Sequence, residues 1–146
     1  MKPVVFRSSG NNLTAGDLRD INRLLSGLNP SPKKVNAKIL KEVLEDGEVL
    51  VVREREKGRI VGIGALFVHR TLTAKIGRIE DVVVDKGVQH RGIGGQLIED
   101  LILKAKELGV EYLELNCAPK CVSVARLYKK HGFKPMPTNS YRYVLS

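Results

Sequence analysis

The sequence has no tryptophan and few aromatic residues of any kind, which make up 5% of its 146 positions. Surfaces that bind nucleic acid by stacking bases need aromatic rings, so this scarcity argues against such a surface. Cysteine is scarce as well. Cys117 and Cys121 are too few for a disulfide framework, and three residues separate them where a common redox or zinc pair has two. We therefore expect reduced thiols.

Long apolar runs and clustered metal ligands are also missing. No stretch approaches the roughly 20 apolar residues of a membrane span, and the segment after Met1 lacks the apolar core of a secretory signal. His69, His90 and His131 lie in three separate segments without metal-ligand spacing. The sequence thus predicts a cytoplasmic protein with no membrane partner and no bound metal.

The chain does have enough apolar residues for one domain, together with an excess of positive charge. With 42% hydrophobic residues, positions 1–146 can bury one substantial core but are too few for two. A net charge of +9 favours an anionic partner, which is nucleic acid, a membrane surface or a phosphorylated small molecule. The lysines are scattered rather than clustered, so we interpret most of them as solvated and expect no specific nucleic-acid partner.

Hydrophobic periodicity predicts a mixed α/β domain. Apolar residues at helical spacing indicate four helices, at residues 14–27, 36–45, 93–109 and 122–131. Runs with strand character indicate six strands, at residues 4–6, 49–52, 60–68, 79–84, 112–115 and 141–145. Turn residues at 8–12 and a loop with two prolines at 29–34 flank the first helix.

A glycine cluster stands where the fourth predicted strand leads through a short loop into the third predicted helix. The first N–H groups of a helix lack intrachain partners and the helix dipole adds positive potential, so this arrangement suits an anion. Gly92 and Gly94 would let a phosphate approach the backbone. Gln96 stands where a P-loop needs lysine, and Leu97 replaces the third glycine of a dinucleotide fingerprint. Both of those motifs are excluded.

The cluster reads Q-x-x-G-x-G from Gln89 to Gly94, directly after a valine-rich strand. This pattern resembles the cofactor motif of the GNAT superfamily of N-acetyltransferases. The segment YKKHGF at residues 128–133 is similar to the closing segment of that superfamily, and it follows a predicted helix. Within the superfamily, GRIEDVVV at residues 77–84 resembles glucosamine-6-phosphate N-acetyltransferases. Together the similarity covers about residues 45–145.

The resemblance implies a GNAT-type fold, with a splayed, mixed sheet of six or seven strands flanked by about four helices. It also implies acetyl-CoA as the cofactor, bound where the sheet opens. The pantetheine arm would pair with the backbone of Val82, Val83 and Val84. The pyrophosphate would meet a run of backbone groups at Gln89, His90, Arg91, Gly92, Ile93, Gly94 and Gly95. Further cofactor contacts are expected from Asn116, Tyr128 and Lys130.

Three residues near the expected thioester have competing interpretations. Tyr128 matches the family tyrosine near the cofactor sulfur, where a phenol could protonate the departing thiolate, although its ring could instead belong to the core. Asn116 stands where the amino-sugar enzymes carry an aspartate, and an amide cannot act as a base. Cys117 could form an acetyl-cysteine, but no histidine partner is implied, so direct transfer is the preferred route.

Two carboxylates and two arginines are candidates for binding the acceptor. Glu80 and Asp81 match positions that face the acceptor in the amino-sugar enzymes. Glu80 is our first candidate for the general base, directly or through water; alternatively, it orients the acceptor or pairs with Arg78 or Arg70. Arg70 and Arg142 could recognise an anionic acceptor, and a solvated or structural role is the competing interpretation of each.

The resulting prediction is direct acetyl transfer from acetyl-CoA to a primary amine of a small molecule, such as an amino sugar or an amino-acid derivative. Acetylation of a protein lysine or N-terminus is the alternative within the same chemistry. A non-catalytic CoA-binding module and a basic nucleic-acid-binding domain are alternatives from other classes. A homodimer is compatible with the sequence, which does not reveal the oligomeric state.

Overall fold

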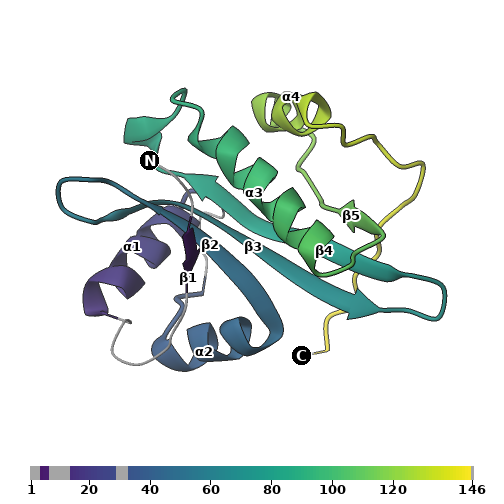
Figure 1. The fold of residues 1–146 in the computed structure, drawn as a ribbon, viewed down its shortest axis with the longest axis horizontal. Coiled ribbons are helices and arrows are strands. Elements are labelled where there is room, and N and C mark those ends of the chain that lie inside the picture. Colours follow the sequence, from purple (N-terminus) through teal and green to yellow (C-terminus); the bar gives the residue numbers. More distant parts are fainter. Residues whose placement is uncertain (1–3, 7–13, 29–32, 146) are drawn as a thin grey trace.

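The computed structural model describes residues 4–6, 14–28 and 33–145, which form one sheet with helices on both faces (Figure 1). The strands are β1 (Val4–Phe6), β2 (Gly47–Arg53), β3 (Ile60–Arg70), β4 (Lys75–Val84) and β5 (Tyr112–Glu114). The helices are α1 (Ala15–Leu25), α2 (Ala37–Asp46), α3 (Ile93–Glu107) and α4 (Val122–Lys130), with a 3-10 turn η1 (Lys86–Val88). The predicted turn at 8–12 and residues 29–32 of the predicted loop lie outside the described residues.

The five strands lie side by side in the order β1-β2-β3-β4-β5. Strands β1 to β4 are antiparallel neighbours, and β5 runs parallel to β4. Strands β2 and β3 form an antiparallel hairpin. Because β4 and β5 are parallel, a crossover must join them, and α3 provides it.

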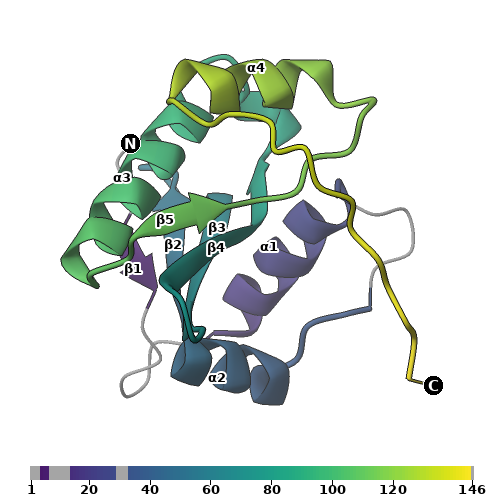
Figure 2. The ribbon, with the colours of Figure 1, turned by 90° about the vertical axis from the view of Figure 1, so that its right-hand side faces the viewer.

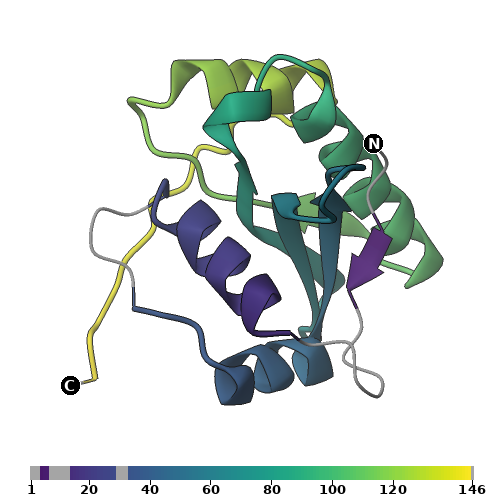
Figure 3. The same cartoon turned by 90° about the vertical axis from the view of Figure 1, so that its left-hand side faces the viewer.

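Alternation along the strands sends apolar side chains to both faces of the sheet. In β2, Val49 and Val51 belong to a core cluster shared with α1 and α2, whereas Leu50 and Val52 belong to one shared with α3. Figures 2 and 3 show the corresponding layers, with α1 and α2 on one side of the sheet and α3 on the other. The chain thus buries two apolar layers around a single sheet.

Helix α3 packs directly over two glycines of β3, where added side chains would crowd it. A Cβ at Gly62 would lie 3.2 Å from Ile93 Cγ2, and one at Gly64 would lie 3.0 Å from Leu101 Cδ1. The apolar stripe predicted for this helix is confirmed, since Ile93, Leu97 and Leu101 are all buried. Among the described residues, no helix is both long enough and apolar enough to cross a bilayer.

The predicted start of the first helix is confirmed in its details. Thr14 caps α1 by accepting a hydrogen bond from the Asp17 N–H at 3.0 Å, and the Thr14 N–H donates back to the Asp17 carboxylate at 3.5 Å. Asp17 also forms an ion pair with Arg53 at 2.8 Å. Burial opposes ionisation of Asp17, yet Arg53 and Thr14 together hold its pKa below the usual value. This carboxylate joins α1 to the end of β2.

The sheet opens between β4 and β5, as the sequence predicts. Backbone pairing joins Ile76–Arg78 to Tyr112–Glu114, after which β4 continues to Val84 beside β3 alone. The register of β3 and β4 shifts between Ile63 and Ala65, and within the extra length of β4 Asp81 takes a φ of 54°. Such a bulge bends a strand locally, so the far half of β4 turns away from β5.

The prediction of six or seven strands is wrong for the described residues, which form five. Residues 141–145, expected as a sixth strand, join no ladder. Residues of the preceding chain, including Lys134 and Ser140, line a cleft beside β5, and Pro135 and Pro137 in that stretch lack the backbone N–H groups that a pairing strand would need. In Figure 2 the chain then runs past β5 and away from the sheet.

We expect Leu101→Ala to destabilise the protein by about 2–5 kcal/mol, because truncation of this fully buried side chain leaves a cavity between α3 and the sheet. Leu103→Ala is the matched control on the same helix. Its side chain is exposed, so the expected change is within about 0.5 kcal/mol. Urea unfolding of both variants measures the difference, and equal midpoints would contradict the packing described for α3.

Candidate functional site

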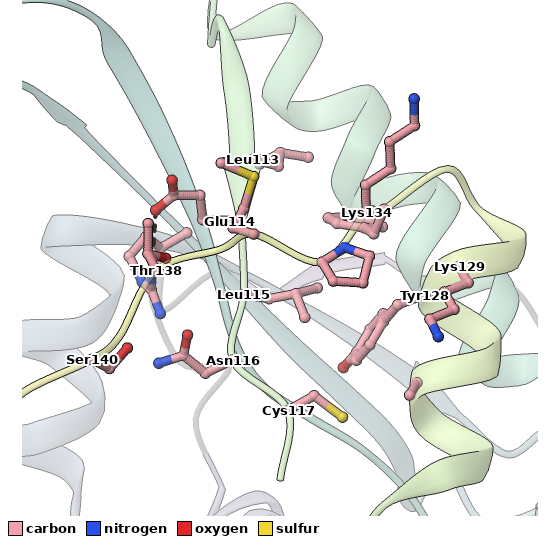
Figure 4. A pocket seen from close by; sticks show the side chains of 15 residues that line it. Leu113, Glu114, Leu115, Asn116, Cys117, Tyr128, Lys129, Lys134, Thr138 and Ser140 are labelled. Atoms are coloured by element: carbon pink, nitrogen blue, oxygen red, sulfur yellow. Dashed lines mark ion pairs between the residues drawn. The ribbon is translucent and has the colours of Figure 1, made fainter. Parts of the chain in front are cut away.

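A cleft of about 580 Å³ lies beside Arg78, where β4 parts from β5. It is bounded by β5, α4 and the chain that follows α4. Asn116, Cys117 and Tyr128 line it, and Figure 4 shows their side chains together in one view. Its wall carries charges of both signs, because Glu114 comes from β5 and Lys134 from the segment after α4. The cleft can therefore accommodate a polar molecule with separate cationic and anionic groups.

The far half of β4 offers an unpaired backbone edge to this opening. Val83 and Val84 pair with β3 on one side, and among the described residues no strand adjoins them on the other. Peptide N–H and C=O groups on such an edge need partners when they are taken out of water. An extended ligand with amide groups can supply those partners by running alongside the strand.

The loop after β4 is anchored at Asp85. The Asp85 N–H donates to the Val61 carbonyl at 2.8 Å, and the Asp85 carboxylate accepts from the Gly87 N–H at 2.8 Å. Arg23 of α1 pairs with the same carboxylate. The Gly87 N–H contributes most to holding the pKa of Asp85 below its usual value, and Arg23 adds to it. The loop is thus tied to β3 and α1 before it reaches the glycine cluster.

The start of α3 is open at the backbone. Gly92 precedes the helix with a φ of 79°, and no side chain caps the first turn. A Cβ at Gly92 would meet no heavy atom within 4 Å, so the approach to this helix end is clear. The N–H groups of the first helical turn have no earlier carbonyl within the helix to bind, and the helix dipole is positive here. An anion fits this position.

The next two glycines have a different role. A Cβ at Gly94 would lie 3.3 Å from Leu127 Cδ2, and one at Gly95 would lie 3.5 Å from His131 Cε1. These contacts place the start of α3 against α4. The sequence interpretation treated Gly92 and Gly94 alike, but only Gly92 leaves open space.

Tyr128 of α4 combines a buried ring with a hydroxyl that points into the cleft. Its side chain is 8% exposed, and the ring packs edge-on against Phe133 with centroids 5.8 Å apart. Figure 4 shows the hydroxyl on the cleft side, directed toward Cys117. Burial raises the pKa of Tyr128, and the nearby thiols of Cys117 and Cys121 raise it further. The phenol is therefore protonated at neutral pH and can donate a hydrogen bond.

Arg78 organises the carboxylates at the parting of the strands. Its guanidinium lies 3.2 Å from the Glu80 carboxylate and 3.7 Å from that of Glu114. Asp81 follows in the bulge, where loss of solvent and the neighbouring Glu80 raise its pKa. The two carboxylates paired with Arg78 outnumber its single positive charge, and Arg78 and Glu114 line the cleft, so this end of the cleft favours a cationic group such as an ammonium.

The predicted cofactor and acceptor residues are not all brought together. Asn116 lines the cleft with Tyr128, whereas Lys130 is exposed at the end of α4. Arg142 lies in the exposed segment after the cleft. Their roles stay predictions.

Arg70 lies apart from this group. It stands at the hairpin end of β3 opposite Lys75, and its guanidinium pairs with Glu111 at 3.4 Å. Of the two arginines considered as partners of Glu80, the structure pairs it with Arg78.

Sequence reasoning missed Glu114 as a member of the site. The alternating run at 112–115 predicts a strand, but alternation does not reveal which strand lies beside it. The parallel register, in which Arg78 lies opposite Glu114, comes from the crossover through α3. A charged residue within an otherwise apolar strand is the one signal that could have drawn attention to this position.

Comparison with known proteins assigns the family. Residues 45–135 match the family model described as an acetyltransferase (GNAT) domain. The chain therefore belongs to the GNAT family and is an N-acetyltransferase-family enzyme, and its four helices and mixed sheet form the GNAT fold.

Individual relatives agree with this assignment. The chain is 32% identical over 130 residues to glucosamine 6-phosphate N-acetyltransferase 1 of rice. This alignment covers 80% of the present chain and 77% of the rice protein. It is 36% identical over 96 residues to a probable second rice enzyme of that name, covering 62% of this chain and 56% of the relative. The structure of a Trypanosoma brucei acetyltransferase superposes with a TM-score of 0.76 at 25% identity, covering 98% and 99% of the two chains.

Proposed function

We propose that this enzyme transfers an acetyl group from acetyl-CoA directly to the primary amine of a phosphorylated amino sugar or a similar small molecule. The observation that carries the proposal is the parting of β4 from β5, with a glycine turn and a helix start at the end of the same strand. An unpaired β4 edge leads to the open start of α3, and the Tyr128 hydroxyl faces the adjoining cleft.

Acetyl-CoA carries amide and phosphate groups that can bind the backbone left without partners at this opening. Its pantetheine amides match the free edge of β4 at Val82, Val83 and Val84, and its pyrophosphate matches the backbone from Gln89 to Gly95. Gly92 supports the fit, because its missing Cβ leaves the approach clear. The reacting thioester would then lie toward the cleft, where bond formation to the acceptor occurs.

The chemistry requires a neutral amine, a stabilised oxyanion and a protonated leaving thiolate. A lysine-like amine is mostly protonated at neutral pH, given a reference pKa of about 10.4. Glu80 remains our first candidate for the base, and its carboxylate lies 3.2 Å from the Arg78 guanidinium. Asp81, whose pKa is raised, is the second carboxylate able to take the proton. Tyr128 donates its proton or a hydrogen bond to the departing sulfur.

The acceptor is inferred from the charges around the cleft. Glu114 and Glu80 near Arg78 favour an ammonium, and Lys129 and Lys134 on the cleft wall favour an anion such as phosphate. The rice relatives are named for glucosamine 6-phosphate, which carries both groups. This molecule is therefore our first choice, and other amines that carry phosphate or carboxylate follow.

We further propose a homodimer that covers the segment 141–145. Tyr141, Tyr143 and Leu145 are each at least 87% exposed, and apolar side chains in such a run favour burial against a partner. The outer edge of β5 is also unpaired in the described part of the chain. In Figure 2 the segment has already run past β5 in its own chain, which favours the same edge of a second copy.

For the cofactor site, we expect Gly92→Glu to weaken CoA binding by about tenfold or more, equivalent to about 1.4 kcal/mol. The variant places a side chain and a negative charge where the pyrophosphate approaches, at a φ that disfavours most residues. Gly92→Asn is the matched control, because asparagine tolerates this backbone conformation and adds no charge. Calorimetry with CoA measures both, and unchanged affinity in Gly92→Glu would reject the site.

For the reaction, we expect the wild type to release CoA thiol from acetyl-CoA with glucosamine 6-phosphate, and faster than with glucosamine. Tyr128→Phe keeps the ring and removes the hydroxyl. Its single-turnover rate should fall by about 10²-fold while acetyl-CoA affinity changes little, as expected for a proton donor that acts in the transition state. Single-turnover conditions prevent slow product release from masking the chemical step.

Two further variants in the same assay distinguish the candidate bases. The larger loss between Glu80→Gln and Asp81→Asn identifies the carboxylate that takes the proton. No thiol release with any amine of a broad panel would reject catalysis, whereas a wild-type rate in a folded Tyr128→Phe protein would reject Tyr128 alone.

For the dimer, sedimentation equilibrium should give twice the mass of one chain for the wild type. Tyr143→Asp should shift the protein toward monomer, because a charge would be buried at the contact. Leu72→Asp is the control: this residue is fully exposed in the hairpin between β3 and β4, outside the proposed interface. A wild type that is monomeric at concentrations used for the assay would refute the proposal.

A further inference from the structure

The proposed reaction leaves two thiols without a role, and both lie in the loop that joins β5 to α4. Cys117 lines the cleft, and Cys121 is the residue directly before α4. Both are free and partly exposed, so a small oxidant can reach them. The Cys121 side chain makes no capping hydrogen bond to the helix.

The backbone between the two cysteines folds back on itself. The Cys121 N–H donates to the Ala118 carbonyl at 2.9 Å, which closes a turn. The Cys117 sulfur lies 3.7 Å from the Ala118 carbonyl oxygen and 3.8 Å from that of Cys121. The sulfur of one cysteine thus already lies against the backbone of the other.

Tyr128 belongs to the same cluster. The two thiols contribute, after burial, to raising the pKa of its phenol, so both lie close enough to act on it. Figure 4 shows the Tyr128 hydroxyl directed toward the Cys117 side chain. A chemical change at the sulfurs therefore takes place next to the group proposed as the proton donor.

We propose that Cys117 and Cys121 form a redox modification site, in which a peroxide joins them as a disulfide and thereby slows acetyl transfer. Burial and the neighbouring Cys121 raise the pKa of the Cys117 thiol, so the Cys121 thiolate is the one that attacks the peroxide oxygen. It becomes a sulfenic acid, and the hydroxide released takes up the thiol proton as water. The second thiol then displaces the sulfenic oxygen as another water, and the S–S bond forms. The two thiols lose two electrons and two protons in total, and hydrogen peroxide is reduced to two waters.

The disulfide acts on the reaction through position. It closes residues 117–121 into a small ring between β5 and α4, and it draws the Cys117 sulfur from the cleft wall toward the start of α4. Tyr128 lies on α4, and transfer depends on its alignment with the thioester. Misplacement of a reacting group by about 1 Å can cost about 10²-fold in rate. A reductant reverses the linkage by thiol exchange.

The test treats the purified protein with hydrogen peroxide and measures three properties before and after dithiothreitol. We expect both thiols to be lost together, the intact mass to fall by two hydrogens, and one cross-linked peptide to contain both cysteines. The single-turnover rate should fall by about tenfold or more and recover on reduction. Cys117→Ser and Cys121→Ser should each show no mass loss of this kind and the same rate with and without peroxide.

Of the measurements that test this inference, only the single-turnover rate rests on the proposed function. The peptide and mass measurements need no substrate, and the carbon-13 signal of the Tyr128 ring, assigned with Tyr128→Phe, reports the local change independently. Two thiols that remain titratable, or separate adducts on each cysteine, would overturn the disulfide. A disulfide that leaves both the ring signal and the rate unchanged would overturn the proposal that this disulfide slows acetyl transfer.

Discussion

The early end of the pairing between β4 and β5 is the constraint on which the site depends. The two strands share three residue pairs, and their junction is tight because a Cβ at Gly77 would lie 2.6 Å from Leu113 Cδ2. Beyond Arg78 the bulge at Asp81 turns β4 aside. If β4 and β5 paired along the whole length of β4, the two strands would satisfy each other's backbone groups. By parting, they leave peptide groups of β4 available to a ligand, with a helix start at the end of the same strand.

Close packing then determines where the reactive groups lie. Because Gly62 and Gly64 have no side chains, α3 can pack directly against β3. In the same way, Gly94 and Gly95 let α4 pack against α3. Tyr128 is carried in by that second contact, and Phe133 holds its ring. Because the ring is buried and the hydroxyl faces the cleft, the two interpretations of this tyrosine are compatible. The ring belongs to the core, and the oxygen is available for chemistry.

The electrostatics of the site differ from those of the whole chain. The net charge of +9 suits anionic ligands and draws them by long-range attraction. At the parting of the strands, however, Glu80 and Glu114 outnumber Arg78. An acceptor with a phosphate and an ammonium can use both fields. Selection of an ammonium would therefore depend on the local charges around Arg78, which the overall composition does not reveal.

Local patterns were enough to predict much of this protein. The start of α1 at Thr14, the apolar stripe of α3 and five of the six strand runs depend on spacing within a few residues, and these are confirmed. The sixth strand failed as a prediction because an apolar alternating run at 141–145 indicates only a capacity to pair, and pairing also needs a neighbour in register. The glycine motif likewise located the start of α3 from sequence alone.

Only the tertiary structure decided which distant residues meet. The parallel register that brings Glu114 to Arg78, the different roles of Gly92 and Gly94, and the cluster of Cys117, Cys121 and Tyr128 all depend on packing between separate elements. The amino-acid sequence by itself determined the helices, most strands and the family motif, because those follow from short-range periodicity and backbone preference. The cleft between β5 and α4 arises from long-range contacts, and no local pattern encodes the distance between its walls.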